Sequence, residues 1–308
     1  MRRLTLPNGM NVAYQVKPEL LQFYDDMFEK RIYTKNGITL REGDCVFDVG
    51  ANIGMFTVFV AHQYPRTRIF AFEPVPQLFE ILSENAAWAE AEVVLCNCAL
   101  SDHAGTAELT FYPNTSGMSS FYPNEEEERA PLRTLIHNEL TQGNAEVENL
   151  LRYEDELVEQ RLKSETVTCQ LRTLSSVIRE YGVERIDLLK VDVEKAELDV
   201  LAGIEEEDWK KIEQAVLEVH DLEGRIQQVT ELFRRNGFKV QLEQDELYQG
   251  SDRYNLYALR ERLSDGEARA ADLQRRRPDR AAALNRVESR AQRVRELLQR
   301  GKGPEKKD

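Results

Sequence analysis

The sequence has few cysteines and no long apolar run. Cys45, Cys96, Cys98 and Cys169 lie in or beside apolar runs and form no CxxC pair, which argues against zinc or dithiol redox chemistry of that type. No stretch approaches the roughly 18 apolar residues of a membrane span, and the basic start at Arg2 and Arg3 is not followed by the apolar segment of a signal peptide. We therefore expect buried free thiols in a soluble, cytoplasmic protein without membrane contact.

Basic residues are also scarce over most of the chain. The 308 residues carry a net charge of −14. Residues 261–308 hold 14 Lys+Arg against 9 Asp+Glu, which leaves 27 bases against 46 acids for residues 1–260. Because phosphate backbones bind basic surfaces, nucleic acid is not expected to be a partner of the main body.

Apolar segments alternate with amphipathic ones along most of the chain. An N-terminal helical segment is expected over 1–40, with a helix at 18–33, and the core is expected over 41–260. Strand-like runs separated by helical periodicity predict a mostly parallel α/β sheet covered on both faces. The runs 238–242 and 254–259 flank a polar turn, which predicts an antiparallel hairpin at the sheet edge.

Two segments depart from this alternation. Residues 113–165 carry 12 acids against 5 bases with helical spacing, and about 50 residues is too long for a plain connection. We expect a helical insertion there, either a lid over the site or a solvated surface excursion. Residues 116–122 are interpreted either as a hinge that brings Phe121 and Tyr122 over the substrate or as a polar surface loop. Residues 261–308 are rich in Arg, Ala, Glu and Gln, and we interpret them as a charged helical linker or tail.

The strongest motif is VFDVGANIG at 46–54. A strand ends in an acid, Asp48, and glycines at 50 and 54 then allow close approach of backbone and ligand before a helix begins. A dinucleotide loop of the pattern GxGxxG would have its middle glycine at position 52, where Asn52 stands, and no lysine follows as in a phosphate loop. A carboxylate at a strand end favours a cationic ligand that bears an amino acid.

A second strand ends in the acid Glu73, within FEP at 72–74 and 23 residues after Gly50. A carboxylate at about this distance from the glycine turn can bind both ribose hydroxyls of a nucleoside. The alternative is that both strand-end acids cap helices.

Together these motifs resemble the FkbM family of methyltransferases. The resemblance covers about residues 40–260 and rests on DVGANIG (48–54), FEP (72–74), ALSD (99–102), LLKVDVEKAE (188–197) and LEVH (217–220). It implies a Rossmann-like class I methyltransferase fold with a seven-stranded sheet. It also implies S-adenosylmethionine as cofactor and S-adenosylhomocysteine as product. In one respect the chain departs from the family pattern, since Lys195 occupies a position that is commonly glycine.

The resemblance assigns cofactor-binding residues by position. Those beside the methionine half are Asp48, Gly50, Ala51, Asn52 and Gly54, with Glu73 and Pro74 at the ribose and Ala99 at the adenine.

Three residues near the ends of later strands are the catalytic candidates. His220 is the expected general base, because an imidazole of unperturbed pKa near 6.5 accepts a proton near neutral pH. Asp192 and Glu194 are expected either to orient it or to stabilise its protonated form. With Glu223 they also offer oxygen ligands for a divalent metal, but the spacing demands none.

The function expected from these motifs is O-methylation of a hydroxyl. The linker-like tail and the family resemblance favour a domain of a modular polyketide or peptide synthase. Its substrate would be a β-hydroxyacyl chain on an acyl carrier protein, with neighbouring synthase domains as further partners. The alternatives are a stand-alone sugar methyltransferase and a non-catalytic interaction module.

Overall fold

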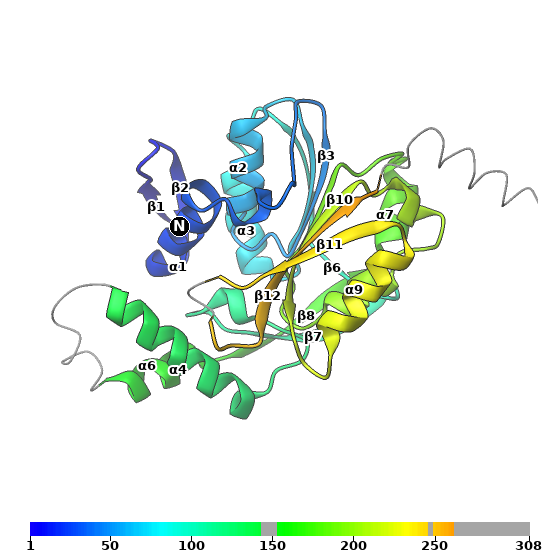
Figure 1. The fold of residues 1–308 in the computed structure, drawn as a ribbon. Coiled ribbons are helices and arrows are strands. Elements are labelled where there is room, and N and C mark those ends of the chain that lie inside the picture. Colours follow the sequence, from blue (N-terminus) through cyan, green and yellow to red (C-terminus); the bar gives the residue numbers. More distant parts are fainter. Residues whose placement is uncertain (143–152, 246–248, 262–308) are drawn as a thin grey trace, which may run out of the picture. The chain divides into compact units, whose positions relative to one another are not determined.

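The computed structural model describes residues 1–142, 153–245 and 249–261. Residues Met1–Arg260 form one compact unit, shown in Figure 1. The expected tail at 261–308 lies outside the described residues apart from Glu261. No helix in the described part of the chain combines the length and apolarity that crossing a bilayer requires.

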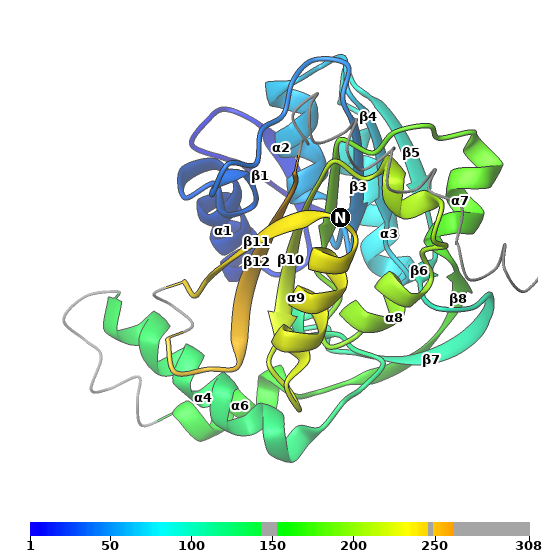
Figure 2. The same ribbon diagram turned by 45° about the vertical axis from the view of Figure 1, so that its right-hand side comes forward.

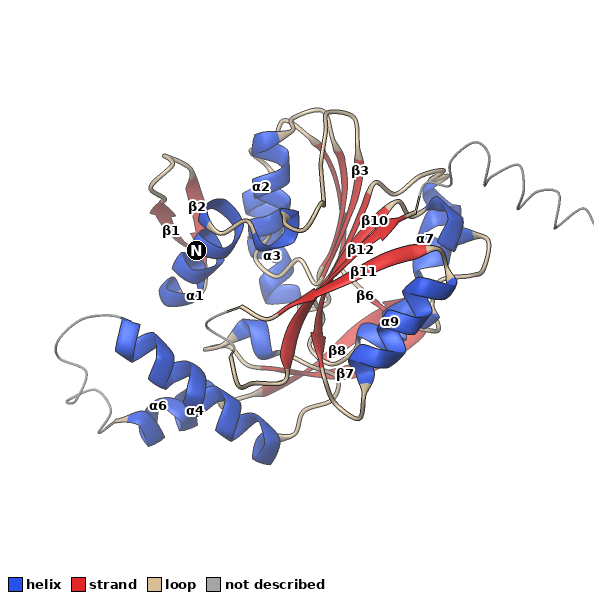
Figure 3. Cartoon of the chain, viewed as in Figure 1, coloured by secondary structure: helices blue, strands red, loops and turns tan. Residues whose placement is uncertain are grey.

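A seven-stranded sheet forms the centre of this unit (Figure 3). Its strands are β3 (Cys45–Val49), β4 (Arg68–Phe72), β5 (Glu92–Cys96), β9 (Leu188–Val191), β10 (Gln214–His220), β11 (Phe238–Glu243) and β12 (Arg253–Arg260). Their order is β11-β12-β10-β9-β3-β4-β5. The pairs from β5 to β10 are parallel, whereas β12 is antiparallel to both β10 and β11. This confirms the expected mostly parallel sheet with an antiparallel edge hairpin.

Alternating residues of the strands bury opposite faces of the sheet. Val46 and Ile69 pack into a core with helices α1 (Lys17–Tyr24), α2 (Met55–Gln63) and α3 (Pro76–Ala86). Phe47 and Phe70 pack into a second core with α7 (Leu174–Tyr181), α8 (Glu197–Ala202) and α9 (Arg225–Arg235). Figure 2 shows these two helical layers on either side of the strands. Near-continuous apolar strands are what a sheet covered on both faces requires.

The N-terminal 40 residues contain more than the expected helix. A hairpin of β1 (Arg2–Thr5) and β2 (Asn11–Tyr14) precedes α1. A π-helix at Asp25–Glu29 and a 3-10 turn at Ile32–Thr34 follow it. The strands are only four residues each, too short for an alternating pattern to stand out in the sequence.

The insertion is helical, as expected, and projects from a second sheet. It contains a 3-10 turn at Ser116–Met118, α4 (Glu125–Gln142) and α6 (Glu154–Arg161). The two helices lie side by side (Figures 1 and 2) and share a small apolar core made of Tyr112, Leu132, Ile136, Val158 and Leu162.

The flanking strands β7 (Gly105–Phe111) and β8 (Glu165–Arg172) pair antiparallel and, with β6 (Ala99–Leu100), make a three-stranded sheet. No strand was predicted at β8, which begins at Glu165, the last residue assigned to the insertion.

The chain order creates a crevice at one edge of the main sheet. From β3 the chain moves outward through β4 and β5, and then returns to place β9 on the other side of β3. Ligands of open α/β sheets bind outside the carboxyl ends of the strands at such a reversal.

Candidate active site

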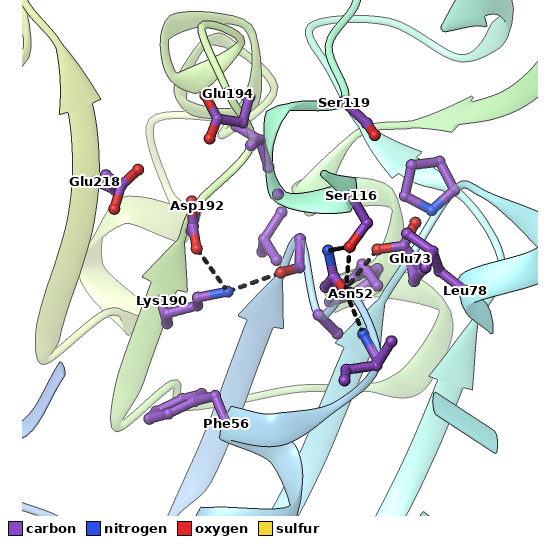
Figure 4. Close-up of a pocket in the computed structure, with 18 of the residues that line it drawn as sticks. Asn52, Phe56, Glu73, Leu78, Ser116, Ser119, Lys190, Asp192, Glu194 and Glu218 are labelled. Atoms are coloured by element: carbon purple, nitrogen blue, oxygen red, sulfur yellow. Dashed lines mark hydrogen bonds and ion pairs between the residues drawn. The ribbon is translucent and has the colours of Figure 1, made fainter. Parts of the chain in front are cut away.

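A pocket lies at this crevice. Its lining brings together eight of the predicted site residues: Gly50, Ala51, Asn52, Glu73, Pro74, Ala99, Asp192 and Glu194. Figure 4 shows Asn52, Glu73, Asp192 and Glu194 around the pocket, on the loops that follow β3, β4 and β9.

The backbone N–H groups of the glycine-rich loop after β3 are hydrogen-bonded within the protein. The N–H groups of Gly50 and Ala51 both donate to the Phe72 carbonyl, at 3.1 and 2.8 Å. Asn52 N–H donates to Glu73 Oε2 at 2.8 Å, and Gly54 N–H donates to the Ala51 carbonyl at 2.8 Å. A phosphate loop instead directs such N–H groups at its ligand. The loop therefore does not form a pyrophosphate cradle.

Gly50 is required by close packing as well as by its conformation. Its φ is +78°, and a Cβ placed on it would lie 1.8 Å from the backbone oxygen of Asp192. The loop after β3 thus packs directly on the turn after β9, which holds the two sides of the pocket in register.

Glu73 is a buried carboxylate at the pocket wall. Its oxygens accept hydrogen bonds from the N–H groups of Asn52 and Val75, each at 2.8 Å. Burial raises the pKa of Glu73 to about 7, although these two hydrogen bonds and Lys190 oppose the rise. A carboxylate has about four acceptor positions, so Glu73 keeps the capacity to accept from two ligand hydroxyls.

Two of the expected cofactor contacts need correction. Asp48 is fully buried below the loop, where Thr57 Oγ1 donates to it at 2.6 Å and Lys190 Nζ lies 3.1 Å from it. It cannot touch a ligand in the pocket. Gly54 packs against α3 instead, because a Cβ there would lie 2.6 Å from Leu82 Cδ1. Both residues shape the loop without lining the pocket.

Lys190 connects the two sides of the pocket and was missed by the sequence analysis. Its buried ammonium donates to the Gly50 carbonyl at 2.8 Å and lies 3.6 Å from Asp192 Oδ2 (Figure 4). Tyr33 Oη also donates to Asp192, at 2.8 Å. The signal was a lysine inside the apolar strand run LLKV, since a fully buried lysine needs an anionic partner.

Glu218 and Arg253 were also missed. Glu218 lies within β10, and burial raises its pKa to about 8 even though Arg253 opposes the rise. The Arg253 guanidinium bridges two carboxylates, with Nε 3.1 Å from Glu218 and a terminal nitrogen 2.9 Å from Glu194. It therefore fixes the position of Glu194 relative to the sheet.

His220 lies near the pocket but in a different protonation state from the one expected. Its Nε2 is 3.0 Å from Glu194 and its Nδ1 is 3.2 Å from Glu197. Burial alone lowers the pKa of His220, but these carboxylates outweigh burial and raise it to about 10. The imidazole is a cation at neutral pH, so the premise that it is poised to accept a proton there is wrong in this arrangement.

The described residues also include one group with the spacing of a metal site. Ligand atoms of Glu194, Glu218 and His220 lie within 4.8 Å of one another. Arg253 already binds both carboxylates, and both ring nitrogens of His220 face carboxylates. A metal at this place would have to break these ion pairs.

The suspected hinge of the insertion forms part of the pocket wall. Ser116 Oγ accepts from Asn52 Nδ2 at 3.1 Å and donates to Glu19 Oε2 at 3.1 Å. Glu19 belongs to α1 and also accepts from the Gly117 N–H at 3.2 Å. The N-terminal helix, the insertion and the glycine-rich loop are thus joined around one serine.

The residues present fit a nucleoside that carries a positive charge. Glu73, Asp192, Glu194 and Glu218 line the pocket, and the loop N–H groups do not form a phosphate cradle. Lys190 and Arg253 also line the pocket, but Lys190 lies in ion-pair contact with Asp192, and Arg253 with Glu194 and Glu218. A pyrophosphate would meet carboxyl groups there, whereas the hydroxyl, ammonium and sulfonium groups of a cationic nucleoside would find acceptors. The sheet order and this pocket define a Rossmann-like class I methyltransferase that uses S-adenosylmethionine.

The comparisons with known proteins give the family. Residues 48–240 match the family model of the methyltransferase FkbM domain. The chain therefore belongs to the FkbM methyltransferases, as the motifs indicated.

Three relatives are similar to the chain over most of its length. It is 41% identical over 257 residues to 31-O-demethyl-FK506 methyltransferase FkbM of Streptomyces tacrolimicus, covering 83% of this chain and 96% of that protein. It is 39% identical over 286 residues to AMB antimetabolite synthetase AmbE of Pseudomonas aeruginosa, covering 91% of this chain but only 13% of AmbE. Methyltransferase sdnD of Sordaria araneosa is 34% identical over 235 residues, covering 73% of this chain and 84% of that protein.

Proposed function

We propose that the protein transfers a methyl group to a hydroxyl of a β-hydroxyacyl chain carried on an acyl carrier protein. The observation that carries the proposal is a second groove that shares five lining residues with the first pocket. Both are lined by Gln22, Phe23, Gly117, Glu194 and Arg253. An acceptor in the groove would therefore meet the cofactor at Glu194 and Arg253.

The proposed cofactor contacts follow the pocket lining. Glu73 and Pro74 would hold the ribose, and Ala99 the adenine. The loop at Gly50–Asn52 and the carboxylate of Asp192 would surround the methionine half. When bound, S-adenosylmethionine supplies an electrophilic methyl carbon attached to a cationic sulfur.

A hydroxyl acceptor must lose its proton as the new bond forms. Glu194 faces both the pocket and the groove, while His220 lines the groove only. In our proposal the Glu194 carboxylate accepts this proton. His220, 3.0 Å from Glu194, and Arg253, 2.9 Å from it, hold that carboxylate in position. The proton acceptor is thus the Glu194–His220 pair and not a neutral His220.

Two relatives support an oxygen as the methyl acceptor and a multi-domain synthase as the context. The name of the Streptomyces tacrolimicus protein specifies methylation of an oxygen. AmbE is a synthetase of which this chain spans 13%, which supports a domain that works beside other synthase domains.

The test is a mass-spectrometric transfer assay with carrier-bound β-hydroxyacyl chains and free sugars as acceptors. A gain of one methyl on the carrier-bound chain alone is expected. Methylation of only the sugar would replace the proposal with a stand-alone sugar methyltransferase. Failure to bind S-adenosylmethionine calorimetrically would favour an interaction module. The control is Glu194→Gln, which should bind the cofactor and transfer no methyl group at a measurable rate.

A further inference from the structure

The turn between β9 and α8 has a backbone that ordinary residues avoid. Glu194 has φ of 45° and Lys195 has φ of 74°. Residues other than glycine seldom adopt this conformation, and surrounding contacts must hold them there. Glycine at position 195 would relieve the strain, so the side chain of Lys195 must provide something that glycine cannot.

That side chain reaches into the insertion. Lys195 Nζ lies 2.7 Å from Glu128 Oε1 of α4, and the two side chains are only 10% and 6% exposed. Glu128 is itself fixed, because the Tyr112 hydroxyl donates to its other oxygen at 2.8 Å. A buried ion pair of this kind is costly to break on one side only.

A second contact from the insertion holds the neighbouring residue. Ser120 Oγ donates to the backbone carbonyl of Glu194 at 2.6 Å. From the opposite side, Arg225 donates to the Lys195 carbonyl at 2.7 Å. The two strained residues are therefore held between the insertion and α9.

We propose that Lys195 and Glu128 are positioning residues that couple the insertion to the transfer site. Their ion pair keeps the turn in the conformation that presents the Glu194 carboxylate to the groove. The inference rests on the proposed function, in which Glu194 meets the acceptor. It also makes the insertion a structural part of the site.

The test uses Lys195→Gly, Glu128→Gln and the double variant of the full chain. Each single change leaves one buried charge without its partner, so both should lower the Tm. The double variant should recover most of the Tm, because neither charge remains and the backbone strain is relieved. Arg31→Gly is the matched control, since Arg31 is exposed and also has positive φ, 54°. It should not alter catalysis.

The readout specific to positioning is a separation of kcat from cofactor affinity. In the double variant kcat should fall about tenfold or more, while the Kd for S-adenosylmethionine stays within about threefold. Lys195→Arg, which keeps the charge, should restore most of kcat. A double variant with the kcat of the unmodified protein would overturn the proposal.

Hydrogen exchange tests the same inference without an acceptor. Amides of the 192–197 turn should exchange faster in the double variant than in the control. If they do not, the coupling is refuted even if the acceptor proposed above proves wrong. Faster exchange with no transfer to any hydroxyl would instead refute the proposed function and leave the coupling in place.

Discussion

The two sides of the pocket are built in different ways. On the side of β3 and β4, main-chain groups and one carboxylate, Glu73, form a wall whose hydrogen bonds are largely satisfied within the protein. On the side of β9 and β10, buried charges from distant parts of the sequence hold one another in place. The side of β3 and β4 is suited to binding one cofactor in a fixed position. The side of β9 and β10 is suited to proton transfer, because the position of each charged group depends on its ion-pair partner.

The largest expected effect comes from adding a methyl group where the loop after β3 packs on the turn after β9. Gly50→Ala would place a Cβ 1.8 Å from the Asp192 oxygen, so the loop and the turn cannot both keep their positions. We expect a loss of about 3 kcal/mol or more in unfolding free energy and no calorimetric binding of S-adenosylmethionine.

Gly182→Ala is the control for that change. Gly182 also has positive φ, +60°, but nothing lies within 4 Å of its added Cβ. It should cost about 1 kcal/mol and leave binding intact. Equal effects of the two substitutions would show that backbone strain alone, and not the contact with Asp192, makes Gly50 necessary.

On the transfer side, His220→Ala should reduce kcat by about 100- to 1000-fold. Removal of the imidazolium leaves Glu194 and Glu197 without the cation between them. The Kd for S-adenosylmethionine should stay within about threefold, because His220 does not line the cofactor pocket. His62→Ala, at an exposed position, should change neither quantity. Near-normal turnover of His220→Ala would remove His220 from the mechanism.

Glu73→Gln should have the opposite pattern. The amide keeps the size of the side chain but replaces an acceptor oxygen with a donor that faces the N–H groups of Asn52 or Val75. We expect the Kd for S-adenosylmethionine to rise about 10- to 100-fold, with kcat at saturating cofactor within a few-fold. Glu80→Gln, at an exposed position of α3, is the control. A fall in kcat with an unchanged Kd would show that the two sides do not divide the work as described.

The contrast between the sides also explains what the sequence could predict. Glu73 was predictable because it follows an apolar strand at a set distance from a glycine turn. Lys190 and Glu218 left a weaker signal, as charges inside apolar strands. Asp48 was wrongly predicted to contact the cofactor, because an acid at a strand end has the same sequence pattern whether its side chain faces a ligand or a buried lysine.

Contacts between distant segments left no signal at all. Lys195 and Glu128 are 67 positions apart, and Arg253 reaches Glu194 across 59. The protonation of His220 depends on such contacts, so the unperturbed pKa of an isolated imidazole was a poor guide to its role.

The smallest expected effect is a pH dependence that distinguishes stability from cofactor affinity. Burial raises the pKa of Glu19 to about 6, of Glu73 to about 7 and of Glu218 to about 8, from 4.5. Between pH 4.5 and the raised pKa of each group, the folded protein therefore binds more protons than the unfolded chain. Its stability falls as pH rises through that range. The stabilisation from charged His220 is complete below pH 6.5 and is lost as pH rises towards about 10.

These contributions have the same sign, so the Tm of the cofactor-free protein should fall steadily between about pH 5 and pH 9. Cofactor affinity should change in the opposite direction, because ionised Glu73 is the better acceptor for ribose hydroxyls, and it should rise with pH through about 7. Scanning calorimetry and titration calorimetry at matched pH separate the two trends. In Glu73→Gln the rise in affinity should disappear while most of the fall in Tm remains. A parallel pH dependence of both quantities would mean that the same groups control stability and binding, and that the two sides of the pocket are not independent.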